Sequence, residues 1–285
     1  MIEKGTRSRA GGSFRNFYLS DPMATDTPAS APLLDVSGLV IEFGHGKERF
    51  RAVKGVDLSI GRKRTLGLVG ESGSGKTTVG RALIRLVKPA AGVIRYDGAE
   101  LTSLSEAGFR PYRKRIQMIF QDPYSSLDPR LSIRDSLREA LDLGHPGEQG
   151  AWEGVMESKM RLVGLAPEYL SRYPHEFSGG QRQRIGIARA LCVEPEFLIC
   201  DEPVSSLDVS IQAQILNLLM DLQDGLGLAY LFISHDLRVV KHISHEVAVM
   251  QRGEIVERKE TEALYGAPEH PYTRTLLEAI PGRAP

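Results

Sequence analysis

The segment LGLVGESGSGKTTVGRAL, residues 66–83, decides the fold class. It joins a short apolar run, residues 66–69, to a glycine-rich turn at residues 70–77. Apolar residues then recur at helical spacing, at Val79, Ala82, Leu83, Leu86 and Val87. A buried strand, a glycine turn and a helix in this order are typical of a loop that binds phosphate. The segment therefore predicts a nucleotide-binding protein with an α/β core.

The turn itself, GESGSGKT, matches the phosphate-loop pattern G-x-x-x-x-G-K-[ST]. Its glycines let backbone N–H groups face phosphate oxygens, and the dipole of the following helix favours an anion. We expect Lys76 to neutralise the β- and γ-phosphates of ATP and the Thr77 hydroxyl to coordinate Mg²⁺. The predicted nucleotide contacts from this segment are Gly70, Glu71, Ser72, Gly73, Ser74, Gly75, Lys76, Thr77 and Thr78.

Polar residues end two further apolar runs. Asp201 and Glu202 close FLICDE at residues 197–202, and His235 follows LAYLFIS at residues 228–234. Ligands of an open parallel sheet lie beyond the carboxyl ends of its strands. We therefore expect Asp201 to bind Mg²⁺, Glu202 to take a proton from the attacking water, and His235 to hold that water near the γ-phosphate. The alternatives are a solvated carboxylate pair and a structural histidine.

The remaining pattern also predicts an α/β protein with a parallel sheet. Alternating apolar residues, as at Val56, Leu58 and Ile60, predict half-buried strands from about Leu33 onward. Residues 116–120 read as another buried strand, residues 131–173 as mostly helical, and residues 246–258 as a hairpin turning at Arg252 and Gly253. Residues 1–32 have the composition of a disordered tail, within which Met23 is an alternative start.

The composition argues against several classes of protein. Lys plus Arg and Asp plus Glu number 36 each, so there is no basic excess for a nucleic-acid partner. The two cysteines, Cys192 and Cys200, are too few for a disulfide scaffold and read as small buried hydrophobic residues. No apolar run approaches the roughly 18 residues of a transmembrane helix. We therefore expect a cytosolic chain that reaches a membrane only through another protein.

The segment FSGGQRQRIGIARAL, residues 177–191, resembles the signature motif of ABC ATPases. Two glycines there expose N–H groups at the start of a helix whose dipole can face phosphate. In that family, the motif serves the nucleotide bound by a partner subunit. The resemblance, which runs from Leu33 to the end of the chain, implies this role for Ser178, Gly179, Gly180 and Gln181.

The resemblance implies further site residues. Gln121 matches the Q-loop, which contacts Mg²⁺ and senses the membrane partner, and His235 matches the switch histidine. Residues 205–208 match the D-loop, in which Asp208 reaches the dimer interface. Phe43 is the candidate for stacking on adenine, with Phe50 as the alternative.

The implied fold is that of a P-loop NTPase of the ABC type. It has a RecA-like parallel-sheet core, an N-terminal antiparallel β subdomain and an inserted helical subdomain at about residues 123–185. The ATPase domain would span residues 33–261, followed by a C-terminal extension at residues 262–285.

Two segments narrow the resemblance to the ATPases of oligopeptide, dipeptide and nickel importers. They are IFQDPYSSLDPRLSI at residues 119–133 and HPYTRTLLEAIP at residues 270–281. The resemblance implies ATP hydrolysis that energises peptide import at the cytoplasmic face of the inner membrane. Its implied partners are a second ATPase subunit, identical or paralogous, two membrane permeases and, indirectly, a solute-binding protein. Some relatives carry an iron–sulfur cluster, which we do not expect here because no cysteine follows Cys200.

The sequence leaves some other functions open. An ABC-type ATPase of a soluble assembly, such as the carbon–phosphorus lyase complex, and an importer of nickel or another small solute remain open. A GTPase or kinase is disfavoured because the chain has no Asn-Lys dipeptide for reading guanine, and because SGGQ has no place in those enzymes. A translation or DNA-repair factor of the ABC type is disfavoured by the single cassette and the lack of sustained heptads.

Overall fold

The computed structural model describes residues 31–44, 46, 49–122, 127–145 and 152–280. The expected disordered tail lies outside these ranges as far as residue 30, and so does Met23. Within them, burial begins at Leu33 and Leu34.

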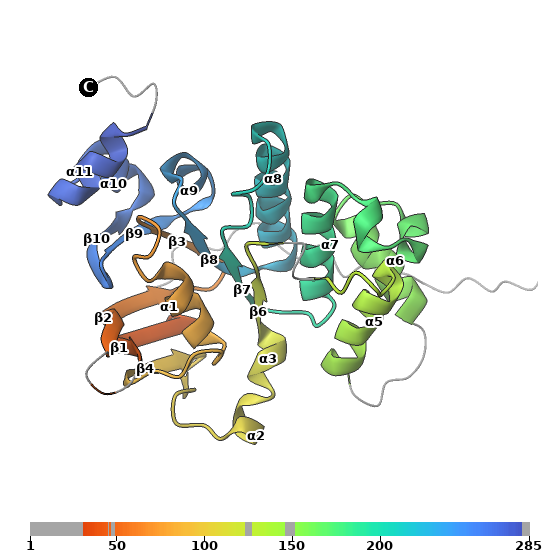
Figure 1. Cartoon of the computed structure of the whole chain (residues 1–285), viewed down its shortest axis with the longest axis horizontal. Coiled ribbons are helices and arrows are strands. Elements are labelled where there is room, and N and C mark those ends of the chain that lie inside the picture. The colour runs from red at the N-terminus through yellow and green to blue at the C-terminus, as the bar shows by residue number, and fades with distance from the viewer. Residues whose placement is uncertain (1–30, 45, 47–48, 123–126, 146–151, 281–285) are drawn as a thin grey trace, which may run out of the picture. The chain divides into compact units, whose positions relative to one another are not determined.

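A six-stranded sheet forms the centre of the described chain (Figure 1). Its spatial order is β10-β9-β3-β8-β7-β6, and the neighbours from β9 to β6 are parallel. Only β10 runs antiparallel, because a two-residue turn at Arg252 and Gly253, both with positive φ, joins it to β9. The predicted parallel sheet and hairpin are thus confirmed. The strands are β3 (Thr65–Val69), β6 (Ile116–Ile119), β7 (Phe197–Asp201), β8 (Ala229–Ser234), β9 (Glu246–Gln251) and β10 (Glu254–Glu260).

The two faces of this sheet are covered by different elements. Side chains alternate along each strand, so Leu198 and Cys200 of β7 belong to one core cluster, and Phe197 and Ile199 to the other. Helices α8 (Val209–Leu226) and α9 (Leu237–Ile243) cover the first face, and α1 (Lys76–Leu83) covers the second. Both cysteines are free and buried, as expected.

A second, antiparallel sheet has the order β2-β1-β4-β5 and shares the core of α1. Its strands are β1 (Leu34–Phe43), β2 (Phe50–Ile60), β4 (Ala91–Tyr96) and β5 (Ala99–Glu100). Val56, Leu58 and Ile60 are all buried, which confirms the predicted alternation. This sheet is the expected N-terminal β subdomain.

Helices separate β6 from β7 along the chain. They are α5 (Ile133–Gly144), α6 (Trp152–Leu162), two short 3-10 helices (Pro167–Ser171 and Pro174–Glu176) and α7 (Gly179–Leu191). Their buried faces join the core on the α8 side of the sheet. They correspond to the expected helical subdomain, although α7 continues to Leu191, beyond the expected end at 185. The boundaries at 33, 123–185 and 262 remain predictions.

Four short helices complete the described chain. They are α2 (Glu106–Phe109), α3 (Tyr112–Arg115), α10 (Thr261–Gly266) and α11 (Pro271–Glu278). Within the described ranges, no helix combines the length and the apolar character that crossing a bilayer requires.

The helix after the glycine loop is shorter than predicted. Helix α1 ends at Leu83, and Leu86 is 61% exposed rather than part of its buried face. Arg85 adopts a left-handed φ of 59°, and the N–H of Leu86 turns back to donate to the Arg81 carbonyl at 2.9 Å. Such a closing turn satisfies the last carbonyls and stops the helix.

Candidate nucleotide site

The glycine loop lies between β3 and α1 at the carboxyl edge of the central sheet. A Cβ on Gly70 would lie 2.1 Å from the Met250 carbonyl oxygen, and one on Gly75 would lie 2.6 Å from that of Ala52. Both glycines also have positive φ. Only glycine fits such close backbone contacts at these angles, so β2 and β9 hold the loop tightly in place.

The side chain of Lys76 is buried within the glycine loop. Its Nζ donates to the carbonyl oxygens of Gly70 at 2.7 Å and Glu71 at 2.8 Å, and to Ser74 Oγ at 3.3 Å. Burial lowers the pKa of Lys76 from its ordinary value, while the nearby carboxylates, Glu202 foremost, oppose the change. These bonds place a cationic donor at the centre of the loop, where phosphate oxygens could replace the carbonyls as its acceptors.

Thr77 and Asp201 meet across the site. Thr77 Oγ1 donates to Asp201 Oδ1 at 2.8 Å. Burial raises the pKa of Asp201, and the hydrogen bond from Thr77 opposes this shift. In the part of the chain that the structure describes, no group of three or more His, Cys, Asp or Glu residues forms a metal site. A hydroxyl and a single carboxylate nevertheless fit Mg²⁺, which takes few protein ligands and completes its shell with phosphate and water.

Glu202 is the meeting point of three strand ends. Its Oε2 accepts from Gln121 Nε2 at 3.0 Å and lies 3.1 Å from His235 Nδ1. The Glu202 backbone is left-handed, with φ of 46°, a conformation that costs a non-glycine residue about 1–3 kcal/mol. Its N–H donates to the Ile233 carbonyl of β8 at 2.9 Å, which helps to hold this conformation.

A cavity of about 800 Å³ unites these groups. Its walls are the glycine loop, the residues after β6, β7 and β8, the aromatic ends of β1 and β2, and one leucine of α11. They comprise Phe43, Phe50, Ala52, Gly70, Glu71, Ser72, Gly73, Gly75, Lys76, Thr77, Thr78, Gln121, Glu202, His235 and Leu276. Of the other candidates, Ser74 and Asp201 do not line the cavity but are hydrogen-bonded to Lys76 and Thr77, which do.

The two aromatic candidates for adenine stacking form a single wall. Phe43 and Phe50 face each other across the β1–β2 pair, with ring centroids 5.8 Å apart. Both rings are partly exposed and both line the cavity. The structure therefore offers a planar base two neighbouring rings rather than one.

Sequence reasoning missed two residues of α11. Leu276 lines the cavity, and the Tyr272 hydroxyl accepts a hydrogen bond from the Glu71 N–H at 3.1 Å. No spacing rule links residues 201 positions apart along the chain. The segment HPYTRTLLEAIP was singled out as a subfamily feature but not as part of the site.

The SGGQ residues lie apart from the cavity. Ser178 Oγ accepts from the Gln181 N–H at 3.3 Å, and Gln181 Oε1 accepts from the Ser178 N–H at 3.0 Å, which forms a capping box at the start of α7. Ser178 is exposed, Gly179 is partly exposed and Gly180 is buried. Asp208 is exposed at the start of α8. Neither the SGGQ residues nor Asp208 is among the described residues that line the cavity of their own chain.

The Cα of Gly180 packs closely against α8. A Cβ on Gly180 would lie 2.5 Å from Ile211 Cγ2, whereas one on Gly179 would lie 3.3 Å from Leu207 Cδ2. We expect Gly180→Ala to lower the free energy of unfolding by about 1–3 kcal/mol relative to Gly179→Ala, because only the first overfills a core contact. Urea unfolding of the two variants measures the difference. Equal midpoints would contradict the argument.

A glycine loop with a buried lysine, beside acidic residues that end a neighbouring parallel strand, defines a P-loop nucleoside triphosphatase. The family described as ABC transporter matches residues 53–205. The chain belongs to the ABC transporter family, as an ATP-binding subunit with an ATPase cassette.

Two similar proteins are named as ATP-binding proteins of import systems. A Brucella ovis protein named for peptide import ATP binding is 51% identical over 254 residues, which cover 89% of this chain and 80% of that protein. The glutathione import ATP-binding protein of Salmonella paratyphi A is 50% identical over 257 residues, covering 88% of this chain and 41% of that protein.

Solved structures share the fold. The cbiO1 subunit from Clostridium perfringens, part of an ABC transporter complex, aligns with a TM-score of 0.73 at 25% identity, over 88% of this chain and 97% of that one. A dimeric ATP-binding cassette bound to ADP and Pi aligns with a TM-score of 0.69 at 24% identity, over 80% of this chain and 98% of that one.

Proposed function

We propose that this ATPase energises a membrane importer of peptides, working with Mg²⁺ at the cytoplasmic face of the inner membrane. One observation carries the catalytic part: Lys76, Thr77, Asp201, Glu202 and His235 converge on one edge of the sheet. The names of the relatives, at about 50% identity, support peptides as the cargo class.

Each side chain has a separable task in this proposal. Lys76 exchanges its carbonyl partners for phosphate oxygens, and the loop N–H groups hold the β-phosphate. Thr77 and Asp201 would hold Mg²⁺, which would supply positive charge to the phosphates. Glu202 accepts a proton from the attacking water, and His235 with Gln121 fixes the orientation of its carboxylate. Gln121 donates to Glu202 through its amide nitrogen, so its amide oxygen is the atom that could contact Mg²⁺.

A second ATPase subunit is part of the proposal. Ser178 and Gly179 are accessible at the start of α7, and Asp208 and Val209 are exposed at the start of α8, the latter at 80%. The N-terminus of α7 favours an anion. We infer that residues 178–181 of one subunit close over the triphosphate bound by the other, with Asp208 at the contact between them.

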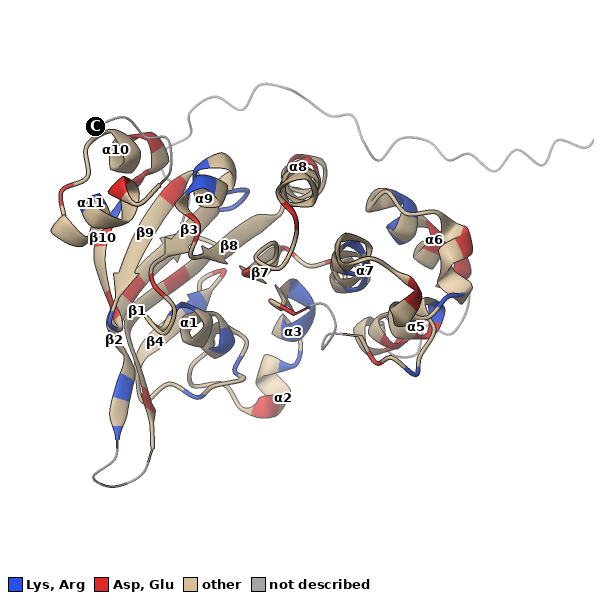
Figure 2. Cartoon of the chain, turned by 45° about the horizontal axis from the view of Figure 1, so that its top comes forward, with Lys and Arg blue, Asp and Glu red and all other residues tan. Residues whose placement is uncertain are grey.

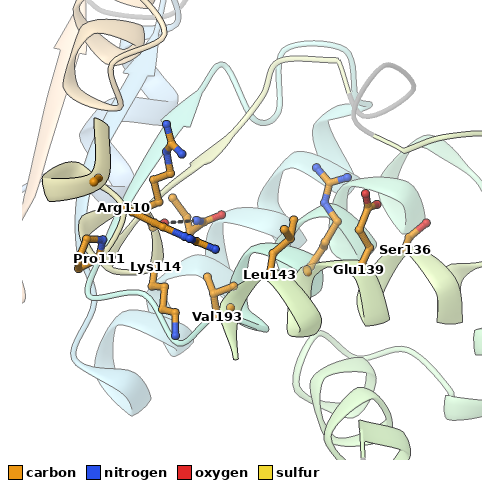
Figure 3. A pocket seen from close by; sticks show the side chains of 13 residues that line it. Arg110, Pro111, Lys114, Ser136, Glu139, Leu143 and Val193 are labelled. Carbon is orange, nitrogen blue, oxygen red and sulfur yellow. Dashed lines mark hydrogen bonds between the residues drawn. The ribbon is translucent and has the colours of Figure 1, made fainter. Parts of the chain in front are cut away.

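A second cavity of about 800 Å³ supports a permease partner (Figure 3). It lies between the α2–α3 segment and helices α5 and α7. Its wall also includes residues of α3 and of β6, and β6 is the strand that leads to Gln121. Leu143, in this wall, is 74% exposed. Arg110, Arg113 and Lys114 supply positive charge, and the basic residues of α3 are blue in Figure 2.

We therefore assign this groove to a cytoplasmic segment of the permease with apolar and acidic side chains. An apolar side chain there can cover Leu143, and carboxylates can pair with the basic rim. Movement of such a segment would reach Glu202 through β6 and Gln121, since Gln121 is hydrogen-bonded to that carboxylate.

Leu143→Arg should separate docking from hydrolysis. We expect uptake by the reconstituted transporter to fall about tenfold or more, because a charge replaces a central apolar contact. ATP turnover by the isolated chain should be unchanged. Leu226→Arg is the matched control, since it places the same charge at the end of α8, outside the groove. Normal uptake by Leu143→Arg would remove the groove from the interface.

The cargo class is tested by reconstitution of this ATPase with candidate membrane permeases. We expect ATP-dependent uptake of di- or oligopeptides into liposomes that contain the complete transporter. Uptake of nickel alone would replace the peptide assignment. Copurification with a soluble enzyme core, and with no permease, would overturn the transport function.

A further inference from the structure

The C-terminal segment contacts the phosphate loop through one side chain. The hydroxyl of Tyr272, in α11, accepts the hydrogen bond of the Glu71 N–H at 3.1 Å. Helix α11 follows α10 after the edge strand β10, as Figure 1 shows. The contact thus joins the last described helix of the chain to the glycine loop.

The peptide group between Gly70 and Glu71 is held at both ends, its N–H by the Tyr272 hydroxyl and its carbonyl by Lys76. The carbonyl of Gly70 and the N–H of Glu71 belong to the same planar unit. The carbonyl accepts from Lys76 Nζ at 2.7 Å, and the N–H donates to Tyr272. When Lys76 turns to phosphate, the carbonyl loses this partner. Tyr272 then keeps the plane of the first peptide of the loop in place.

Tyr272 can do this because α11 is itself firmly anchored. Leu277 of the same helix is buried in the core. Ahead of the helix, the buried carboxylate of Glu257 accepts from the N–H groups of Glu269 at 2.8 Å and His270 at 3.0 Å. His270 Nδ1 in turn accepts from the Tyr272 N–H at 3.2 Å. The hydroxyl is therefore fixed to β10 and the core, independently of the loop.

We propose that Tyr272 is a positioning residue of the nucleotide site, through which the C-terminal segment, residues 267–280, sets the affinity for ATP. The inference rests on the proposed nucleotide site. Leu276 adds apolar contact from the same helix to the same cavity. Coupling of this kind is reciprocal, so ATP must also stabilise α11.

The test compares Tyr272→Phe with Tyr265→Phe. The first loses only the hydroxyl that meets the loop, and the second loses the bond from Tyr265 in α10 to the Leu237 carbonyl. We expect Tyr272→Phe to raise the Kd and KM for ATP about threefold to tenfold, the loss of one neutral hydrogen bond. Its kcat should stay close to that of the unaltered chain. Tyr265→Phe should leave both constants unchanged, whatever its effect on Tm.

Hydrogen exchange measures the coupling between ATP and α11 directly, and a purely structural role of Tyr272 would not produce such coupling. In the unaltered chain, ATP should slow amide exchange in residues 268–280, and in Tyr272→Phe this slowing should be reduced. If Tyr272→Phe does not fold, Glu257→Gln replaces it. The N–H groups of Glu269 and His270 donate to different oxygens of Glu257, and an amide replaces one of these oxygens by an NH₂ donor. This variant should raise the KM in the same direction.

A failure of the role proposed for Tyr272 can be distinguished from a failure of the proposed nucleotide site. The role of Tyr272 would be overturned if the tested variant has unchanged Kd and KM for ATP. It would also be overturned if the rate of amide exchange in residues 268–280 is the same with and without ATP. If Lys76→Ala binds ATP normally in the same assay, the proposed nucleotide site itself fails.

Discussion

Glu202→Gln is expected to lower ATP turnover by about 10²–10⁴-fold, the usual contribution of a general base. The amide is the same size as the carboxylate, so the contacts to Gln121 and His235 and the left-handed backbone can persist. It cannot, however, accept a proton from water at neutral pH. ATP should therefore bind and remain intact, with the two subunits held together around it.

Single-turnover measurements with the partner subunit present separate binding from hydrolysis. Glu254→Gln is a suitable control, because it makes the same chemical change on the exposed edge strand β10, away from the cavity. Turnover at the level of the unaltered chain in Glu202→Gln would remove Glu202 from the mechanism.

Lys76→Ala is expected to weaken ATP binding by on the order of 10–100-fold, since each charge-assisted hydrogen bond contributes about 1.5–3 kcal/mol. The ammonium group is the only buried cation among the described residues that line the cavity. Its removal also frees the carbonyls of Gly70 and Glu71, so the loop loses its internal bridge.

Isothermal calorimetry with a non-hydrolysable ATP analogue measures this loss directly. Lys88→Ala provides the control, since Lys88 is exposed beyond the end of α1. Affinity in Lys76→Ala equal to that in the control would exclude Lys76 from the site. A loss of the folded state, visible by circular dichroism, would call for Lys76→Met, which keeps most of the side-chain volume.

Much of the site follows from local patterns. The residues that follow strands β3, β7 and β8 were predicted to meet because parallel strands end at a common edge. The structure brings Lys76, Thr77, Asp201, Glu202 and His235 together at that edge. Their roles in catalysis remain predictions that the variants above test.

Other parts of the site have no local signal. The periodicity at Leu86 and Val87 predicted a longer helix, and the left-handed Arg85 ended it. The choice between Phe43 and Phe50 could not be made from spacing, and the register of β1 and β2 places both rings in one wall.

The amino-acid sequence alone predicted the alternation of core strands and helices, the glycine loop and the polar residues at the strand ends. Hydrophobic periodicity and turn chemistry are properties of a few neighbouring residues, so they can be recognised locally. The folded chain was needed to show that Tyr272 of α11 touches Glu71, that Glu202 contacts both Gln121 and His235, and that the SGGQ residues do not line the cavity of their own chain. Contacts between positions far apart in the chain depend on how the layers pack and which faces remain open. No short pattern encodes that arrangement.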